Sequence, residues 1–495
     1  KQQMVDAVLI IVAIVISLVI LFGIVVFMVL MQHPEDKRQA WGSKIIVLLG
    51  LFLSCVTVLL LPFDIAMKSD PSTYEHIGKL WYACFIGIAC FAFVICPFAS
   101  SWYETDEEET FGRRMGTALC WTGVYAFVFM MMTLILYLTL GFVDLPVTIV
   151  TAPLLDRGDE VSISVMNCEG DNKYCSIPST VSIRTSAAIY ILAMLSFFGW
   201  FLLMVFGGIG MSSLPIDLIQ AWRFRPKSID LAEFAAKKNE MKTKVSQLLL
   251  LGREQQVLFK ANPHKRKEKM FANKFRAMIY ELENDYEKLQ ICYKEHGGNP
   301  FFPWLKLFFG VWGVIISISW LIQIVLNVFM KGCEGKCPFL NEVFIQLNNA
   351  FPLFGTCAYG VFAFYLLVAV VKGAMKFGMK LFIISIHPLK PGATLMNAML
   401  FNTGMILVCT AAIVQFCTTA FAGYARLTAV SQIFVTQVQY LKFLSVFYNL
   451  NVFWYIFVAL SIAACAYSLI EPCLRKKKTV EEQMKDAGKQ TRRGR

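Results

Sequence analysis

The sequence predicts an all-α polytopic membrane protein with about nine transmembrane helices and a cytoplasmic, coiled-coil-like helical hairpin. Of its 495 residues, 57% are hydrophobic and only 16% are charged, whereas a soluble globular protein carries about 25% charged residues. Several apolar runs exceed the roughly 20 residues that cross a hydrocarbon core of about 30 Å. One long polar segment, Arg223–Pro303, interrupts these runs. An outer-membrane barrel is excluded, because its strands are short and alternate apolar with polar residues.

The transmembrane spans follow from the apolar runs, taken in chain order. Ala7–Met31 contains no charge and has no small-residue cleavage site after it. It is also too long for the apolar core of a signal peptide, so we expect a retained first span. The same criteria predict the other spans at Lys44–Ala66, Leu80–Phe98, Thr117–Val143, Thr185–Ser212, Leu305–Met330, Phe351–Val371, Asn397–Ala422 and Asn451–Leu469.

Basic residues in the short loops predict the orientation of the spans. Because the number of spans is odd, the two termini lie on opposite sides of the membrane. Cytoplasmic loops carry an excess of Lys and Arg, which favours an N-terminus outside and a cytoplasmic C-terminus. The inside positions are then Lys37, Arg38, Lys44, Arg113, Arg114, Lys372, Lys376, Lys380, Lys390 and the tail Arg475–Arg495. The net charge of +12 therefore marks the cytoplasmic side and indicates no nucleic-acid partner.

This orientation divides the chain into four regions. A first transmembrane half covers residues 1–212, and a cytoplasmic helical hairpin covers 213–304. A second transmembrane half covers 305–470, and a basic cytoplasmic tail covers 471–495. The hosting membrane is expected to be the plasma membrane or an endolysosomal or vacuolar membrane.

The hairpin is predicted from two apolar patterns with spacings of three and four residues, which are typical of a coiled-coil seam. Asn262-Pro263 breaks the pattern between the arms, and the basic cluster Lys265, Arg266 and Lys267 follows. Either the arms pair with each other, or one face recruits a cytosolic protein; the basic turn is a candidate contact for such a partner or for anionic lipid. The seam residues are Leu231, Phe234, Met241, Val245 and Leu248 in the first arm, and Phe275, Ile279, Leu282, Tyr286, Leu289 and Tyr293 in the second.

Two close pairs of cysteines lie in loops that the charge pattern places outside. Cys168 and Cys175 are in the loop Asp144–Arg184, and Cys333 and Cys337 are in the loop Lys331–Ala350. Disulfides persist in oxidising compartments, so we expect two local disulfides. The alternative is a zinc site built from all four thiols, although such sites usually have tighter paired spacing.

Motifs for catalysis, for cofactor binding and for metal binding are missing from the sequence. The chain has no Walker-type phosphate loop, no His-Glu-x-x-His and no Gly-x-Ser-x-Gly. Its five histidines are scattered over separate segments. We therefore name no catalytic, cofactor-binding or metal-binding residue, expect no cofactor, and disfavour an enzyme.

Polar side chains inside the spans form the candidate intramembrane site, because a polar group in hydrocarbon is costly and often functional. The candidates are Asp64, Gln323, Asn327, Asn402 and Gln415. The alternative for the amides is hydrogen bonding between helices, worth about 0.6 to 2 kcal/mol each. For Asp64 the alternative is a helix cap at the membrane interface.

Five stretches of the chain resemble the limb-region-1-like membrane protein family, most closely its plant-type LIMR members. The most specific is the block Pro388–Asn397. The stretches are Gln32-His33-Pro34-Glu35-Asp36, Leu60-Leu61-Pro62-Phe63-Asp64, Gly207-Gly208-Ile209-Gly210 with Leu214-Pro215, Phe339–Ile345, and Ser385–Asn397. The resemblance implies nine spans, an N-terminus outside and a large cytoplasmic loop. It also implies a role as an endocytic receptor for lipocalins, as a lysosomal escort in cobalamin export or in signalling, with no agreed catalytic residues.

The favoured hypothesis is a non-enzymatic receptor or trafficking escort. Its partners are the lipid bilayer, an extracellular or luminal ligand, and cytosolic trafficking or signalling proteins that bind the hairpin. A small-molecule transporter or channel that uses the polar residues of the sixth and eighth spans is the alternative. A structural subunit of a membrane complex remains equally compatible with the sequence.

Overall fold

The computed structural model describes residues 2–33, 36, 41–67, 71–105, 110–151, 175–225, 227–261, 266–294, 299, 301–329, 339–351, 353–376, 380–381, 384–385, 389, 392 and 394–474. The chain forms two compact units. The first comprises Lys1–Ser213 with Ile316–Ala464, and the second comprises Leu214–Ile315 with Cys465–Arg495.

Nine helices within the described ranges are long and apolar enough to cross a membrane, which confirms the predicted number of spans. The helices of the spans are α1 (Gln2–Met31), α2 (Trp41–Met67), α3 (Pro71–Cys90) continued by α4 (Cys96–Glu104), α5 (Phe111–Leu140), α6 (Ala187–Leu202) continued by α7 (Gly208–Arg223), α10 (Phe301–Phe329), α12 (Phe354–Lys376), α13 (Met396–Ala420) and α16 (Val452–Leu474). The fifth span therefore continues past its expected end at Ser212, because Pro215 lies inside α7 without ending it.

Helix α13 is the centre of the first unit and packs against α2, α4, α6 and α12. In the most apolar stretch of its span, 89% of the residues are buried. The corresponding shares for the spans of α1 and α5 are 11% and 6%. Small side chains let helix backbones approach closely inside a membrane, where apolarity alone does not separate core from lipid. The small residues of α13 include Thr403, Gly404, Cys409, Thr410, Ala411, Ala412, Cys417 and Thr418. Ile, Val and Leu dominate α1 instead, and most of its side chains between residues 11 and 30 are exposed.

Two spans contain a short π-helical segment. Phe91–Ile95 joins α3 to α4, and Leu203–Gly207 joins α6 to α7. The first segment precedes Pro97, which has no backbone N–H to give to the carbonyl four residues earlier. A wider turn accommodates that missing bond without ending the span.

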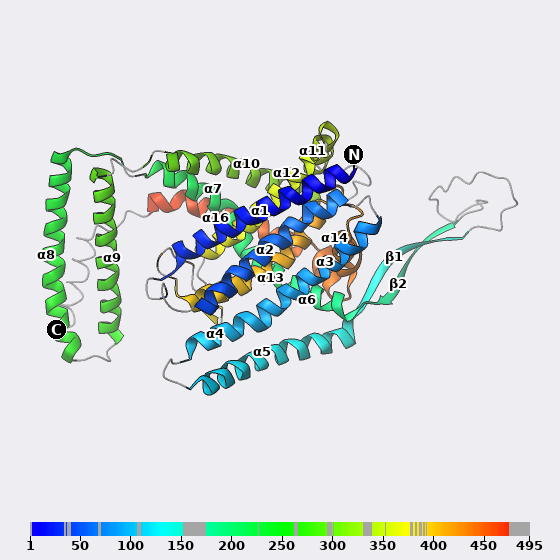
Figure 1. Cartoon of the computed structure of the whole chain (residues 1–495), viewed down its shortest axis with the longest axis horizontal. Coiled ribbons are helices and arrows are strands. Elements are labelled where there is room, and N and C mark those ends of the chain that lie inside the picture. Colours follow the sequence, from blue (N-terminus) through cyan, green and yellow to red (C-terminus); the bar gives the residue numbers. More distant parts are fainter. Residues whose placement is uncertain are drawn as a thin grey trace. The chain divides into compact units, whose positions relative to one another are not determined.

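A two-stranded antiparallel ribbon connects α5 to α6 and was not expected from the sequence. Strand β1 (Phe142–Thr151) pairs with β2 (Cys175–Arg184), from Phe142 opposite Arg184 to Thr151 opposite Cys175. Figure 1 shows the ribbon extending from the ends of these two helices. The fourth span consequently ends at Leu140, before its expected end at Val143. The sequence signal was present, because both strands are rich in Val, Ile and Thr, which favour strands.

The chain between α13 and α16 folds into short helical turns. They are α14 (Ala429–Ser431), a π segment (Gln432–Gln437), a 3-10 turn (Val438–Tyr440) and α15 (Leu444–Asn449). Leu441 bridges to Val143 of β1, and the Lys442 amide donates to the Phe142 carbonyl at 2.9 Å. These contacts fix the base of the ribbon. Two further elements complete the first unit: α11 (Phe339–Ala350), between α10 and α12, and the pair β3 (Lys380–Leu381) and β4 (Ile384–Ser385).

The second unit contains two long antiparallel helices, α8 (Leu231–Ala261) and α9 (Arg266–Lys294) (Figure 1). Leu248 is buried against Met278, and the Phe234 and Tyr293 rings stack with centroids 4.3 Å apart. A Cβ at Gly252 would lie 2.8 Å from the Phe275 ring, so this glycine admits the close approach of α9. The two arms therefore contact each other, while a supercoil of the coiled-coil type stays a prediction.

The expected seam is only partly interior. Leu231 and Val245 are 60% and 42% exposed, and Ile279 and Tyr286 are 37% and 39% exposed. Leu231 is the first residue of α8. Because Phe234 lies opposite Tyr293, near the end of α9, Leu231 lies beyond that end and has no residue of α9 opposite it. Val245, Ile279 and Tyr286 lie beside the contact line, because the buried contact on α9 passes through Met278, which the seam had omitted.

Candidate functional site

Asp64 is the only acidic residue of the candidate set, and the fold uses it as a helix cap. Its fully buried carboxylate accepts hydrogen bonds from the backbone amides of Ala429 at 3.0 Å and Val430 at 2.9 Å. The Trp81 indole N–H donates to the same group at 2.9 Å. Backbone amides at a helix start have no partner within the helix. Asp64 therefore joins α2, α3 and α14 at one point.

Gln415 of α13 forms a second buried node. Its side-chain oxygen accepts from the Ser196 hydroxyl, from the Trp200 indole at 2.8 Å and from the Tyr448 hydroxyl at 3.3 Å. Burial raises the pKa of Tyr448, so its phenol is a neutral donor at ordinary pH. The three donors come from α6 and α15, so this amide ties both to the central helix.

Replacement of Gln415 by leucine is expected to lower the free energy of unfolding by about 2–4 kcal/mol, because buried donors lose their common acceptor. The measurement is unfolding of the purified full chain in mixed micelles by increasing denaturing detergent, followed by tryptophan fluorescence. Gln432, an exposed glutamine, supplies the matched control, and Gln432→Leu should change stability by less than about 0.5 kcal/mol. Equal stabilities of the two variants would contradict the assigned role.

The other three amides do not join Gln415. The Gln323 side chain donates to the Ala420 carbonyl at 2.9 Å and accepts from the Leu340 amide at 3.2 Å. Asn402 donates to the Ala398 carbonyl within its own helix at 2.7 Å, and Asn327 is half-buried. Thirteen residues separate Asn402 from Gln415, which is about 20 Å along a helix. The geometry therefore favours packing between helices over a shared polar path.

The stretch that follows α1 meets the stretch that precedes α13, although some 360 residues separate them. Asp36 accepts from the Met396 amide, the first residue of α13, at 3.0 Å and from the Tyr103 hydroxyl at 2.8 Å. Beside this cap, the His33 amide donates to the Thr394 carbonyl at 3.0 Å. Two stretches that carried the family resemblance are thus parts of one helix-capping structure.

Asn397 extends this structure to α4. Its side chain accepts from the Ser100 hydroxyl and donates to the Glu104 carboxylate. Next to it, the Arg114 guanidinium lies 4.9 Å from the Trp102 ring centre and donates to the Trp102 carbonyl at 3.3 Å. Polar groups from α4, α5 and α13 therefore converge at this end of the first unit.

The Gly207–Gly210 stretch has a packing role. A Cβ at Gly210 would lie 1.7 Å from the Ala369 carbonyl oxygen, and a Cβ at Gly373 would lie 2.0 Å from the Phe206 carbonyl oxygen. Helix α12 therefore touches α7 and the π-helical segment Leu203–Gly207 backbone to backbone, and only glycine fits at these two positions.

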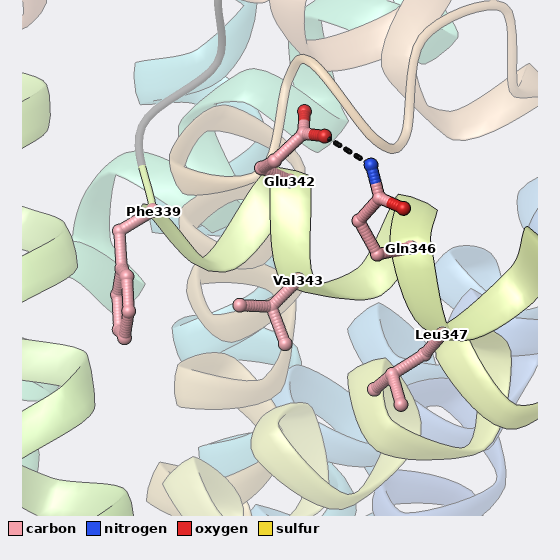
Figure 2. Close-up of a pocket in the computed structure, with 5 residues that line it drawn as sticks. All are labelled: Phe339, Glu342, Val343, Gln346 and Leu347. Carbon is pink, nitrogen blue, oxygen red and sulfur yellow. Dashed lines mark hydrogen bonds between the residues drawn. The ribbon is translucent and has the colours of Figure 1, made fainter. Parts of the chain in front are cut away.

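A surface depression of about 430 Å³ lies along α11. Figure 2 shows the five residues that line it: Phe339, Val343 and Leu347 follow one another along the helix, and the hydrogen-bonded side chains of Glu342 and Gln346 lie beside them. That bond runs from the Gln346 amide to the Glu342 carboxylate and is 2.7 Å long. The depression is therefore apolar with one polar edge.

The predicted disulfides and the basic turn cannot be compared with the structure. Cys168, Cys333, Cys337 and Lys265 lie outside the described residues, as do the side chains of Cys175, Arg266 and Lys267. Within the part of the chain that is described, no group of three or more His, Cys, Asp or Glu side chains is placed to hold a metal ion.

Sequence reasoning missed the donors on which the polar residues depend. Trp81, Trp200 and Tyr448 are aromatic residues whose single polar atom is buried. Such atoms usually need a partner, which is a signal available from sequence. The signal does not name the partner, because Asp64 and Gln415 lie on other elements.

Comparison with known proteins agrees with the motifs. A family model described as LMBR1-like membrane protein matches residues 9–296 and 273–470. A LIMR family protein of Dictyostelium discoideum is 33% identical over 502 residues, which cover 95% of this chain and 98% of that protein. LIMR family proteins of Oryza sativa subsp. japonica and Arabidopsis thaliana are each 33% identical, over 95% of this chain and 97% of their own length. No solved structure matches the chain. The chain therefore belongs to the LMBR1-like, or LIMR, family of multi-pass membrane proteins.

Proposed function

We propose that this chain is a non-enzymatic receptor or trafficking escort of the LIMR type. Its outer loops bind an extracellular or luminal ligand, and the α8–α9 hairpin binds a cytosolic trafficking or signalling protein. The observation that carries the proposal is an exposed apolar strip along one face of this hairpin. The orientation with the N-terminus outside, inferred from the basic loops, puts the hairpin in the cytosol.

The apolar strip consists of Val245 and Leu249 on α8 with Ile279 and Tyr286 on α9. Leu249 is 58% exposed, and the other three are 37% to 42% exposed. Leu249 follows the buried Leu248 by one residue, and Ile279 follows the buried Met278 in the same way. In an antiparallel helix pair, positions that follow the contact line by one residue lie on the same side of the pair. The four side chains therefore share one face.

Charges border the strip with opposite signs. Lys238 and Lys242 are exposed on α8, and Glu283 and Glu287 are exposed on α9. An amphipathic helix laid along two helices presents an apolar stripe to the seam and polar residues to its edges. A partner helix with acidic residues toward α8 and basic residues toward α9 is complementary to this face.

The bundle gives the transporter alternative less support. That alternative needs Gln323, Asn327, Asn402 and Gln415 to line one path. Gln323 and Gln415 are instead engaged in hydrogen bonds between elements of the first unit. A receptor or escort needs no such path, because it acts through its surfaces.

Leu249→Asp in the full chain is expected to remove most of the cytosolic proteins that copurify with the parent, since a charge in the strip opposes burial of an apolar partner face. Ile279→Asp should remove the same proteins. The measurement is quantitative affinity purification with identified partners. Deletion of residues 231–293 should give the same loss and leave the transmembrane spans inserted.

Leu250→Asp is the matched control. Leu250 is 65% exposed and neighbours Leu249 in sequence, but the helix turns it by about 100° onto a different face. The control should retain the full set of partners. An unchanged set with Leu249→Asp, or equal loss with Leu250→Asp, contradicts the proposed surface.

A further inference from the structure

We propose that α11 lies in the membrane interface and that the depression along it binds an acyl chain of a membrane phospholipid. The charge pattern predicts that the loop Lys331–Ala350 lies on the outer side of the membrane. An interfacial α11 lies at the membrane surface on that side, and its position is independent of the proposed receptor function.

Hydrogen bonds at both ends hold α11 against the membrane-spanning helices. At its start, the Leu340 amide donates to the Gln323 side chain at 3.2 Å. Gln323 lies within the span Phe301–Val328, five residues before its end, which is about 8 Å along a helix. At its end, Asn348 accepts from the Gly355 amide at 2.9 Å, in the first turn of α12. The start of α11 is therefore held beside a residue of a membrane span, and its end is held beside the first turn of the next span.

The inward face of α11 is already occupied. Leu340, Asn341 and Phe344 are buried, and the Asn341 oxygen accepts from the Tyr424 amide at 3.1 Å. The Phe344 ring lies 5.2 Å from the ring centre of Phe421. The outward face is consequently the only one that meets the surroundings.

The spans on either side of α11 in the chain also expose apolar side chains. Phe339 and Val343 are 50% and 37% exposed, beside a span whose Ile322 and Val325 are 44% and 40% exposed. Phe354, at the start of α12, is 55% exposed. Exposed apolar side chains on spanning helices face lipid, and an interfacial α11 would place its own exposed apolar side chains in the same environment.

The polar edge fits an interfacial position. In Figure 2 the Glu342–Gln346 pair lies beside Phe339, Val343 and Leu347, and it forms the polar edge of the depression that all five side chains line. An interfacial helix buries its apolar side at the acyl boundary and keeps its polar side toward the headgroups and water. An acyl chain along the apolar side fills the depression, while the Glu342–Gln346 pair stays hydrated.

Thiol reactivity tests the placement in the full chain reconstituted in phosphatidylcholine liposomes. Val343→Cys and Gln346→Cys are compared, because both positions are exposed on the same helix. A membrane-impermeant maleimide is supplied on both sides, and labelling of the α11 peptide is followed by mass spectrometry. The thiolate is the reactive form and is disfavoured in hydrocarbon, so position 343 should react at least about tenfold more slowly than position 346. After denaturation the two rates should become equal.

A photoreactive benzophenone side chain at position 343 identifies the occupant. The expected product carries the mass of one phospholipid. Rates that differ by less than about twofold in liposomes, or a crosslink to protein without a lipid adduct, would overturn the proposal. Failure of the hairpin variants to lose their partners has no bearing on either readout.

Discussion

Asp64→Ala is expected to lower the free energy of unfolding by about 3–6 kcal/mol, because three buried donors lose their acceptor and each costs about 1–3 kcal/mol. Those donors are the Trp81 indole and the amides of Ala429 and Val430. A loss of this size is a large part of the total stability of an ordinary protein, about 5–15 kcal/mol. The measurements are the yield of monodisperse protein and the thermal midpoint in detergent, and both should be lower than those of the parent.

Glu75→Ala is the matched control for Asp64. Glu75 is a carboxylate on the adjacent α3, its side chain is 73% exposed and it forms a surface ion pair with Lys79. Exposed ion pairs contribute little to stability, so this variant should behave like the parent. Asp64→Asn should fall between the two, because its one oxygen still accepts hydrogen bonds. A stable Asp64→Ala protein that has lost only ligand binding or transport would instead assign Asp64 to function.

Gly210→Ala is expected to cost roughly 3 kcal/mol or more, at the upper end of the range for overpacked cores. The new methyl group would lie 1.7 Å from the Ala369 carbonyl oxygen, and a backbone atom cannot move aside as a side chain does. Helices α7 and α12 must therefore separate along their contact. The thermal midpoint of the purified chain measures this loss.

Gly123→Ala provides the opposite expectation with the same chemical change. A Cβ at Gly123 meets nothing within 4 Å, and Gly123 lies in the middle of α5. Alanine there should leave stability unchanged or raise it by up to about 1 kcal/mol, because glycine is the poorer helix former. Equal thermal midpoints of the Gly210→Ala and Gly123→Ala variants would contradict the close approach of α7 to α12.

Residue patterns were sufficient for the spans and for the two arms of the hairpin. Uninterrupted apolar runs fix a spanning helix locally, and the Asn262-Pro263 break separates two apolar periodicities. The ribbon of β1 and β2 was missed, because two short strands have a weaker signal than a span and the intervening loop hides their pairing. The exposed Val245 and Ile279 show a second limit, because the buried contact on α9 passes through Met278, which the predicted seam omitted.

The candidate polar residues were identified from sequence, but their roles were not. Asp64 and Gln415 were singled out because polar groups are costly in a membrane, and both a functional site and a structural contact satisfied that reasoning. In the fold, both side chains accept hydrogen bonds from partners far along the chain, which favours a structural contact. Val430 is 366 positions from Asp64, and Trp200 is 215 positions from Gln415.

The sequence alone determined the membrane class, the number of spans and the family, because each depends on local composition or on contiguous motifs. Only the tertiary structure decided which spans form the core and where each buried donor finds its acceptor. Lipid and the protein interior are equally apolar, so hydropathy cannot show that α13 is in the core and that α1 faces lipid. Close backbone contact and completed hydrogen bonds make that choice, and both depend on residues that the fold brings together.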